Sequence, residues 1–189
     1  MTQRGGDQAA GLRALCGTAG APLLALHVVG GAPAVARGTA SAVLQLGLQA
    51  GTLTVLDGRG PAGKHLPAQL RAGSPAALSV ALVDRHFVWL PLHAAHHLVL
   101  SEASARGAHE AFSRFALLAQ SGAPRLLSAV YNARDRDDAQ RFAGELGGLV
   151  AQRLGLAPAW LGQLEAPGFG ARLAGWLQPP PPSAAGAAA

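Results

Sequence analysis

The sequence predicts an α/β fold with three layers, in which helices cover both faces of a parallel β-sheet. Two observations lead to this prediction. Short apolar runs of strand length recur along the chain, and segments with helical apolar spacing lie between several of them. Strands that alternate with helices are joined by right-handed crossovers. Such crossovers make the strands parallel and place ligands at their carboxyl ends.

Six apolar runs are candidates for strands, at residues 23–30, 52–57, 77–84, 96–102, 125–132 and 157–164. Helical spacing is found at 7–16 and 40–50, along a stripe between Ala108 and Ala119, at 136–154 and at 169–178. Asp135 is the expected N-cap of the helix at 136–154, because a carboxylate there accepts from free first-turn amides. We divide the chain into an N-terminal helix (1–20), an α/β domain (21–177) and a disordered Pro/Ala tail (178–189).

Length and composition narrow the class of protein. The chain has 189 residues, which suffice for one domain with a sizeable core. The formal charge is +5, but the arginines are scattered rather than clustered, so we expect no nucleic-acid partner. No apolar stretch reaches the roughly 18 residues of a membrane span, and no signal peptide precedes Leu23. The single cysteine, Cys16, excludes an internal disulfide and fits a reducing cytoplasm.

A glycine-rich loop, GGAPAVARGTAS, follows the first predicted strand and precedes a predicted helix. This is the setting of a phosphate-binding loop, in which backbone amides cradle phosphates, a lysine neutralises them and a hydroxyl holds Mg²⁺. The arrangement resembles the MinD/ParA ATPases, whose deviant loop reads GKGGVGKTT, and it implies a P-loop NTPase-like fold. Spacing back from Gly51 then sets Arg37 on the phosphate lysine, Gly38 on the magnesium-binding threonine and Thr39 on the next hydroxyl.

Several groups that the resemblance requires are missing. Ala32 stands in place of the signature lysine, Pro33 lacks an amide donor, and Gly38 has no oxygen for Mg²⁺. Arg59 stands where a water-positioning aspartate is expected. We therefore expect no catalytic residue, no metal site, no bound Mg²⁺, and ATP or ADP bound weakly or not at all.

The resemblance implies residual nucleotide contacts at Gly30, Gly31, Arg37, Gly38, Thr39, Asp57, Asp84 and Asn132. For Asp57, Asp84 and Asn132, strand-end capping and turn formation remain the alternative. A second cluster, formed by His93, His96 and His97, lacks matching carboxylate or cysteine spacing, and we expect it to begin a strand rather than bind metal.

The heptapeptide DQAAGLR at 7–13 resembles the DQAxxLR activator element of the FlhG (FleN/YlxH-like) regulators of flagellar number. In that family a short helix docks on FlhF, a GTPase of the signal-recognition type, and stimulates its hydrolysis. The resemblance implies partner-binding residues Asp7, Gln8, Ala9, Leu12 and Arg13, and it extends over most of 7–177. An ordinary N-terminal helix capped by Asp7 is the alternative.

Two functions follow as expectations. The first is a cytoplasmic regulator of flagellar number or placement that contacts an FlhF-like GTPase, with flagellar switch or transcription factors as further partners and ATP hydrolysis absent or weak. The alternative is an active MinD/ParA-like ATPase that works as a positioning switch at a membrane or on DNA. We expect the segment 169–178 to pack against the sheet through one helical face formed by Phe169, Leu173, Trp176 and Leu177. Weak membrane contact of this segment at the inner membrane or cell pole is the alternative.

Overall fold

The computed structural model describes residues 23–30, 53–57, 78–83, 94, 96–122 and 125–177, with only the backbone described at 53–57 and 78–83. Its strands are β1 (Leu23–Val29), β2 (Leu53–Asp57), β3 (Leu78–Val83), β4 (His96–Glu102), β5 (Leu126–Tyr131) and β6 (Ala159–Gln163). Its helices are α4 (Ala105–Gln120), α5 (Arg136–Leu154) and α6 (Phe169–Leu177). The expected helices at 7–16 and 40–50 and the tail at 178–189 lie outside the described residues.

The strands form one sheet in the order β2-β3-β1-β4-β5-β6, and every neighbouring pair is parallel. The prediction of an α/β fold with a parallel sheet is therefore confirmed. β1 lies between β3 and β4: on one side the chain places β2 at the edge and then returns inward with β3, and on the other side β4, β5 and β6 follow outward in order. The switch point between the two directions lies at β1 and β4.

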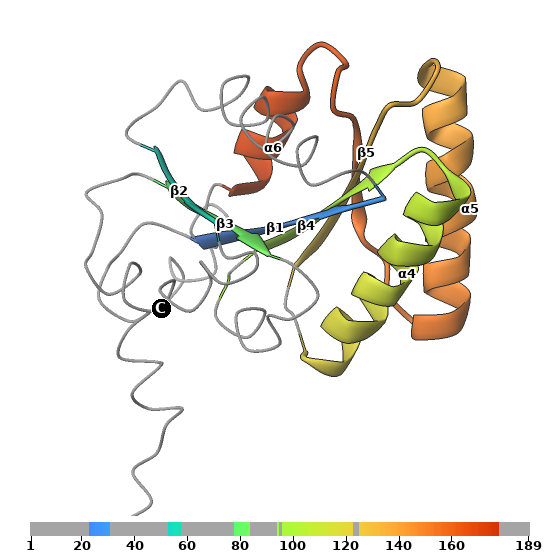
Figure 1. Cartoon of the computed structure of the whole chain (residues 1–189), viewed down its shortest axis with the longest axis horizontal. Helices are drawn as coiled ribbons and strands as arrows, with labels where there is room; N and C mark the ends of the chain where they lie inside the picture. Colours follow the sequence, from blue (N-terminus) through green and yellow to red (C-terminus); the bar gives the residue numbers. More distant parts are fainter. Residues whose placement is uncertain are drawn as a thin grey trace, which may run out of the picture.

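Helices cover both faces of the sheet: α4 and α5 lie together on one face and α6 lies on the other (Figure 1). Since strand side chains alternate between faces, Leu24 and Leu26 of β1 pack on the α6 side, and Val29 packs on the α4 side. Phe115 of α4 is almost wholly buried in that second core. Its burial contributes roughly 2–3 kcal/mol.

Local chemistry sets the ends of the long helices. α4 begins after Ser104, whose side chain accepts from the backbone amide of Gly107 at 3.0 Å. α5 begins after Asp135, which accepts from the amide of Asp138 at 2.8 Å, so the predicted N-cap is confirmed. Gly155 ends α5 with a φ of 66°, a left-handed conformation that glycine adopts at little cost.

α6 packs on the sheet through Phe169, Leu173 and Leu177, which are buried. Trp176, which we expected on the same face, is 42% exposed, and that prediction is wrong. Gly170 is also buried, so the buried stripe is centred near Leu173 and Trp176 is turned to its margin. Membrane contact by this segment stays a prediction. In the described part of the chain, no helix is long and apolar enough to cross a membrane.

Candidate functional site

The candidate site lies where the carboxyl ends of β1, β4 and β5 meet. Ligands of parallel α/β sheets bind outside the carboxyl ends of the strands at the switch point. Here that point is occupied by Gly30, which follows β1, and by the turn from β4 into α4. This edge of the sheet is therefore the candidate ligand-binding site of the fold.

Two glycines allow the start of α4 to lie directly against the end of β1. Gly30 has a φ of 91°, and a Cβ added there would lie 2.8 Å from the Glu102 Cβ and 2.8 Å from the Gly107 Cα. A Cβ on Gly107 would lie only 2.1 Å from the Glu102 carbonyl oxygen. The backbones are thus too close for any side chain at either position. The switch point between β1 and β4 is closely packed on this side.

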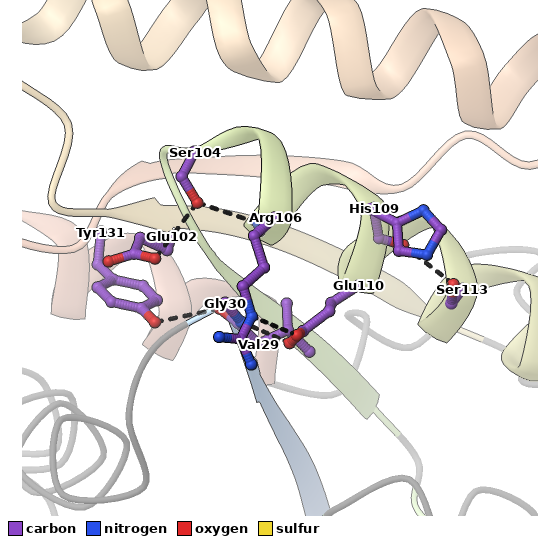
Figure 2. A network of polar contacts seen from close by, with 10 residues as sticks. Val29, Gly30, Glu102, Ser104, Arg106, His109, Glu110, Ser113 and Tyr131 are labelled. Atoms are coloured by element: carbon purple, nitrogen blue, oxygen red, sulfur yellow. Dashed lines mark hydrogen bonds and ion pairs between the residues drawn. The ribbon is translucent and has the colours of Figure 1, made fainter.

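The backbone amide of Gly30, the first residue of the glycine-rich loop, donates a hydrogen bond to a carboxylate. The Gly30 amide donates to Glu110 Oε2 at 2.8 Å, and Arg106 Nε donates to Glu110 Oε1 at 2.8 Å (Figure 2). The Arg106 hydrogen bond, followed by the Gly30 amide, lowers the pKa of Glu110. Glu110 is therefore an anion at neutral pH, and it accepts the hydrogen bond of the Gly30 amide.

Further carboxylates continue along the edge. Ser104 Oγ donates to Glu102 Oε2 at 3.2 Å (Figure 2). The backbone amide of Asn132 donates to Glu165 Oε1 at 3.1 Å, and its side-chain Nδ2 donates to Glu102 Oε1 at 3.4 Å. These contacts link the ends of β4, β5 and β6. We call the set the carboxyl-edge network; its members are Gly30, Glu102, Ser104, Arg106, Glu110, Asn132 and Glu165.

Three of the predicted nucleotide residues stand at this edge. Gly30 follows β1, Asp57 ends β2, and Asn132 follows β5 with a φ of 55°. The left-handed backbone of Asn132 is typical of turn formation at a strand end, the alternative role given above. Its side-chain amide donates to Glu102. The remaining predicted residues lie outside the described part of the chain: Asp7, Gln8, Ala9, Leu12, Arg13, Gly31, Arg37, Gly38, Thr39 and Asp84.

Sequence reasoning missed the two carboxylates that dominate the site. Glu102 had a local signal, since it is the last residue of a predicted strand and therefore had to reach this edge. Glu110 had none, because Gly30 is 80 positions away from it in the sequence. Only the packing of α4 on β1 brings the two together.

Among the described residues, the carboxyl edge carries more negative than positive charge. Glu102, Glu110 and Glu165 supply negative charge, and the guanidinium of Arg106 is already paired with Glu110. Like unit charges 4 Å apart repel by about 1 kcal/mol in water and about 4 kcal/mol near a protein surface, so an anion brought against these carboxylates would be opposed. Within the described residues, no group of three or more His, Cys, Asp and Glu side chains is arranged to hold a metal ion.

A buried histidine pair lies deeper, between the sheet and α4. His27 Nε2 of β1 and His97 Nδ1 of β4 are 3.3 Å apart, and both side chains are fully buried. Burial, then the charge of the buried Arg114, then His97 lower the pKa of His27 well below 6.5. His27 is thus neutral in the folded chain, whereas the unfolded chain takes up a proton below about pH 6.5. Stability from this group is therefore present above that pH and is lost as the pH falls.

The predicted histidine cluster is not one site. His96 and His97 begin β4 as expected, but as successive strand residues they point to opposite faces of the sheet. His93 lies outside the described residues. The partner of His97 is instead His27, a residue the sequence did not single out.

No protein-family model matches the chain, and a comparison with curated proteins finds no significant match. The proposed function therefore rests on the residues of the carboxyl edge and on the sequence motifs.

Proposed function

We propose that the chain is a regulator that acts through protein contacts. It would be a MinD/ParA-like scaffold whose ATP hydrolysis is absent or weak. Its resemblance to the FlhG regulators implies a role in flagellar number or placement. The contact element is the heptapeptide at 7–13, with an FlhF-like GTPase as the partner. Flagellar switch or transcription factors are further partners that the resemblance implies.

The contact function rests on the heptapeptide, and the structural observation that supports weak or absent hydrolysis is the hydrogen bond from the Gly30 amide to Glu110. A phosphate that used this amide would have to displace a carboxylate already held by Arg106. A hydrogen bond to a charged group contributes about 1.5–3 kcal/mol, and the displaced anion would also repel the phosphate. The loop sequence supports the same conclusion, since Gly38 has no oxygen to offer Mg²⁺.

The test is GTP hydrolysis by an FlhF-type GTPase mixed with the purified full chain. We expect stimulation by the unaltered chain and its loss in Gln8→Ala and Leu12→Ala, because these changes remove the polar and apolar anchors of the heptapeptide. Gln3→Ala is the matched control, as it makes the same change just outside the heptapeptide. Equal stimulation by the Gln3 and Gln8 variants, or none by the unaltered chain, contradicts the proposal.

An active MinD/ParA-like ATPase is the second candidate. The observation in its favour is that Gly30, Asp57 and Asn132 stand at the ends of parallel strands along one edge, as the resemblance implies for nucleotide contacts. This candidate requires magnesium-dependent phosphate release that depends on Arg37. The proposal requires that no such release occurs beyond a trace.

A further inference from the structure

A concave surface lies beside β6, and neither Gly30 nor Glu110 lines it. It is a cavity of about 730 Å³ between the start of α5, β6 and the turn into α6, and its volume is in the range of ligand sites. The side chains that matter for its chemistry are Arg136, Gln140, Trp160, Gln163, Glu165 and Arg172. We call this surface the β6 groove.

Trp160 gives the β6 groove an aromatic wall. Its side chain is 38% exposed although it belongs to a strand of the sheet. A partly exposed tryptophan in a concavity is typical of the residues that dominate protein–protein binding. Trp176 is exposed to a similar extent, at 42%, but it does not line the groove. The two tryptophans therefore offer a matched comparison.

Two guanidinium groups give the groove its charge. Among the described residues the ion pairs are Arg106–Glu110 and Arg141–Asp138, so neither Arg136 nor Arg172 is paired with a carboxylate there. The Arg172 side chain is held in place, because its Nε donates to the Leu161 carbonyl at 2.6 Å. It retains unused N–H donors, since a guanidinium has five.

The bulge in β6 explains how Arg172 reaches this position. Ser128 pairs with Trp160 and Ala129 pairs with Gly162, so Leu161 is the extra residue of a bulge. Gly162 has a φ of 105°, and a Cβ there would lie 3.0 Å from the Arg172 Nη2. The missing side chain leaves room for the guanidinium.

We propose that the β6 groove binds an acidic segment of a partner protein that carries one large apolar side chain. The carboxylates of the segment would pair with Arg136 and Arg172, and its apolar side chain would pack on Trp160. Among the described residues that line the groove, Arg136 and Arg172 outnumber the single carboxylate, Glu165, which accepts from the backbone amide of Asn132. The groove is formed by residues other than the heptapeptide at 7–13, so the proposal adds a second contact element to the one proposed above.

The test is fluorescence anisotropy of a labelled peptide made of glutamate, aspartate and one phenylalanine, titrated with the full chain. We expect saturable binding in the micromolar range that weakens as salt is added. Trp160→Ala and Arg136→Gln each weaken binding about tenfold, a typical effect of losing a central contact. Trp176→Ala and Arg153→Gln are the matched controls and leave the affinity unchanged, because both residues are exposed outside the groove.

The controls separate a specific site from general attraction to a chain of formal charge +5. Arg136 is an exposed helix residue, so Arg136→Gln remains informative if Trp160→Ala fails to fold. The proposal is overturned if no saturable binding is found below about 1 mM, or if control and groove variants weaken binding equally. Equal binding of a peptide with serine in place of every acid also overturns it.

Discussion

Replacing Gly107 with alanine should destabilise the protein, whereas the same change at Gly147 should stabilise it. Both glycines lie within helices, Gly107 in α4 and Gly147 in α5. A Cβ at Gly147 meets nothing within 4 Å. At Gly107 it would lie 2.1 Å from the carbonyl oxygen of Glu102 and 2.9 Å from its carbonyl carbon. The obstacle is backbone, which cannot rotate away as a flexible side chain can.

The magnitude follows from this geometry. A carbon and an oxygen that are not bonded approach to about 3.3 Å, so α4 and the end of β4 would have to separate by about 1 Å. Overpacking costs about 1–3 kcal/mol, and backbone displacement puts Gly107→Ala at the upper end. The gain in helix propensity offsets about 1 kcal/mol, which leaves a net loss of about 2 kcal/mol. Gly147→Ala has only the gain of about 1 kcal/mol.

Thermal denaturation followed by circular dichroism measures both effects. For a chain of this size we expect Gly107→Ala to lower the Tm by about 4–8 °C and Gly147→Ala to raise it by about 2–4 °C. Urea midpoints should change in the same directions. A Gly107→Ala protein as stable as the parent, or both variants moving in one direction, would refute the close packing of α4 on β4.

Three other changes test separate contacts. Asp135→Ala removes the N-cap of α5 and should lower the unfolding free energy in urea by about 1 kcal/mol; no change would refute the cap. Glu110→Ala should cost about 1 kcal/mol by the same measurement, because the Gly30 amide loses a charged acceptor that is partly exposed. Glu110→Gln keeps an acceptor oxygen, and a loss as large as that of alanine would contradict this role. Lowering the pH from about 7.5 to about 5.5 should reduce stability, since the folded chain holds His27 neutral. His27→Leu should flatten this dependence and the exposed His109→Gln should not; an unchanged slope in His27→Leu would contradict it.

The sequence predicted the parallel sheet well because each strand carries its own local signal. Runs such as 23–30 and 96–102 are apolar throughout, as buried parallel strands must be, and they became β1 and β4. The start of α5 was predictable for the same reason, since the Asp135 cap bonds an amide three positions away. Strands and helix caps depend on residues close together in the sequence, so a short stretch of sequence is enough to predict them.

Contacts between distant segments could not be inferred in this way. The bond from Gly30 to Glu110 and the pair of His27 with His97 join residues 80 and 70 positions apart. Both depend on the order of the strands, which places β4 directly beside β1. Trp176 shows the same limit, because the packing partners of α6 decide which side of the helix is buried. The sequence therefore indicated that Gly30, Asp57 and Asn132 follow or end strands, but not which carboxylates lie beside Gly30 and Asn132.

The central claim is that the protein works through protein contacts and not through ATP hydrolysis. Its most direct test is phosphate release from ATP by the purified full chain in the presence of Mg²⁺. We predict at most a trace above the rate of buffer alone, unchanged in Arg37→Ala, because the Gly30 amide is hydrogen-bonded to Glu110 and Gly38 has no oxygen for Mg²⁺. Magnesium-dependent turnover that is abolished by Arg37→Ala would contradict the proposal and favour the active ATPase.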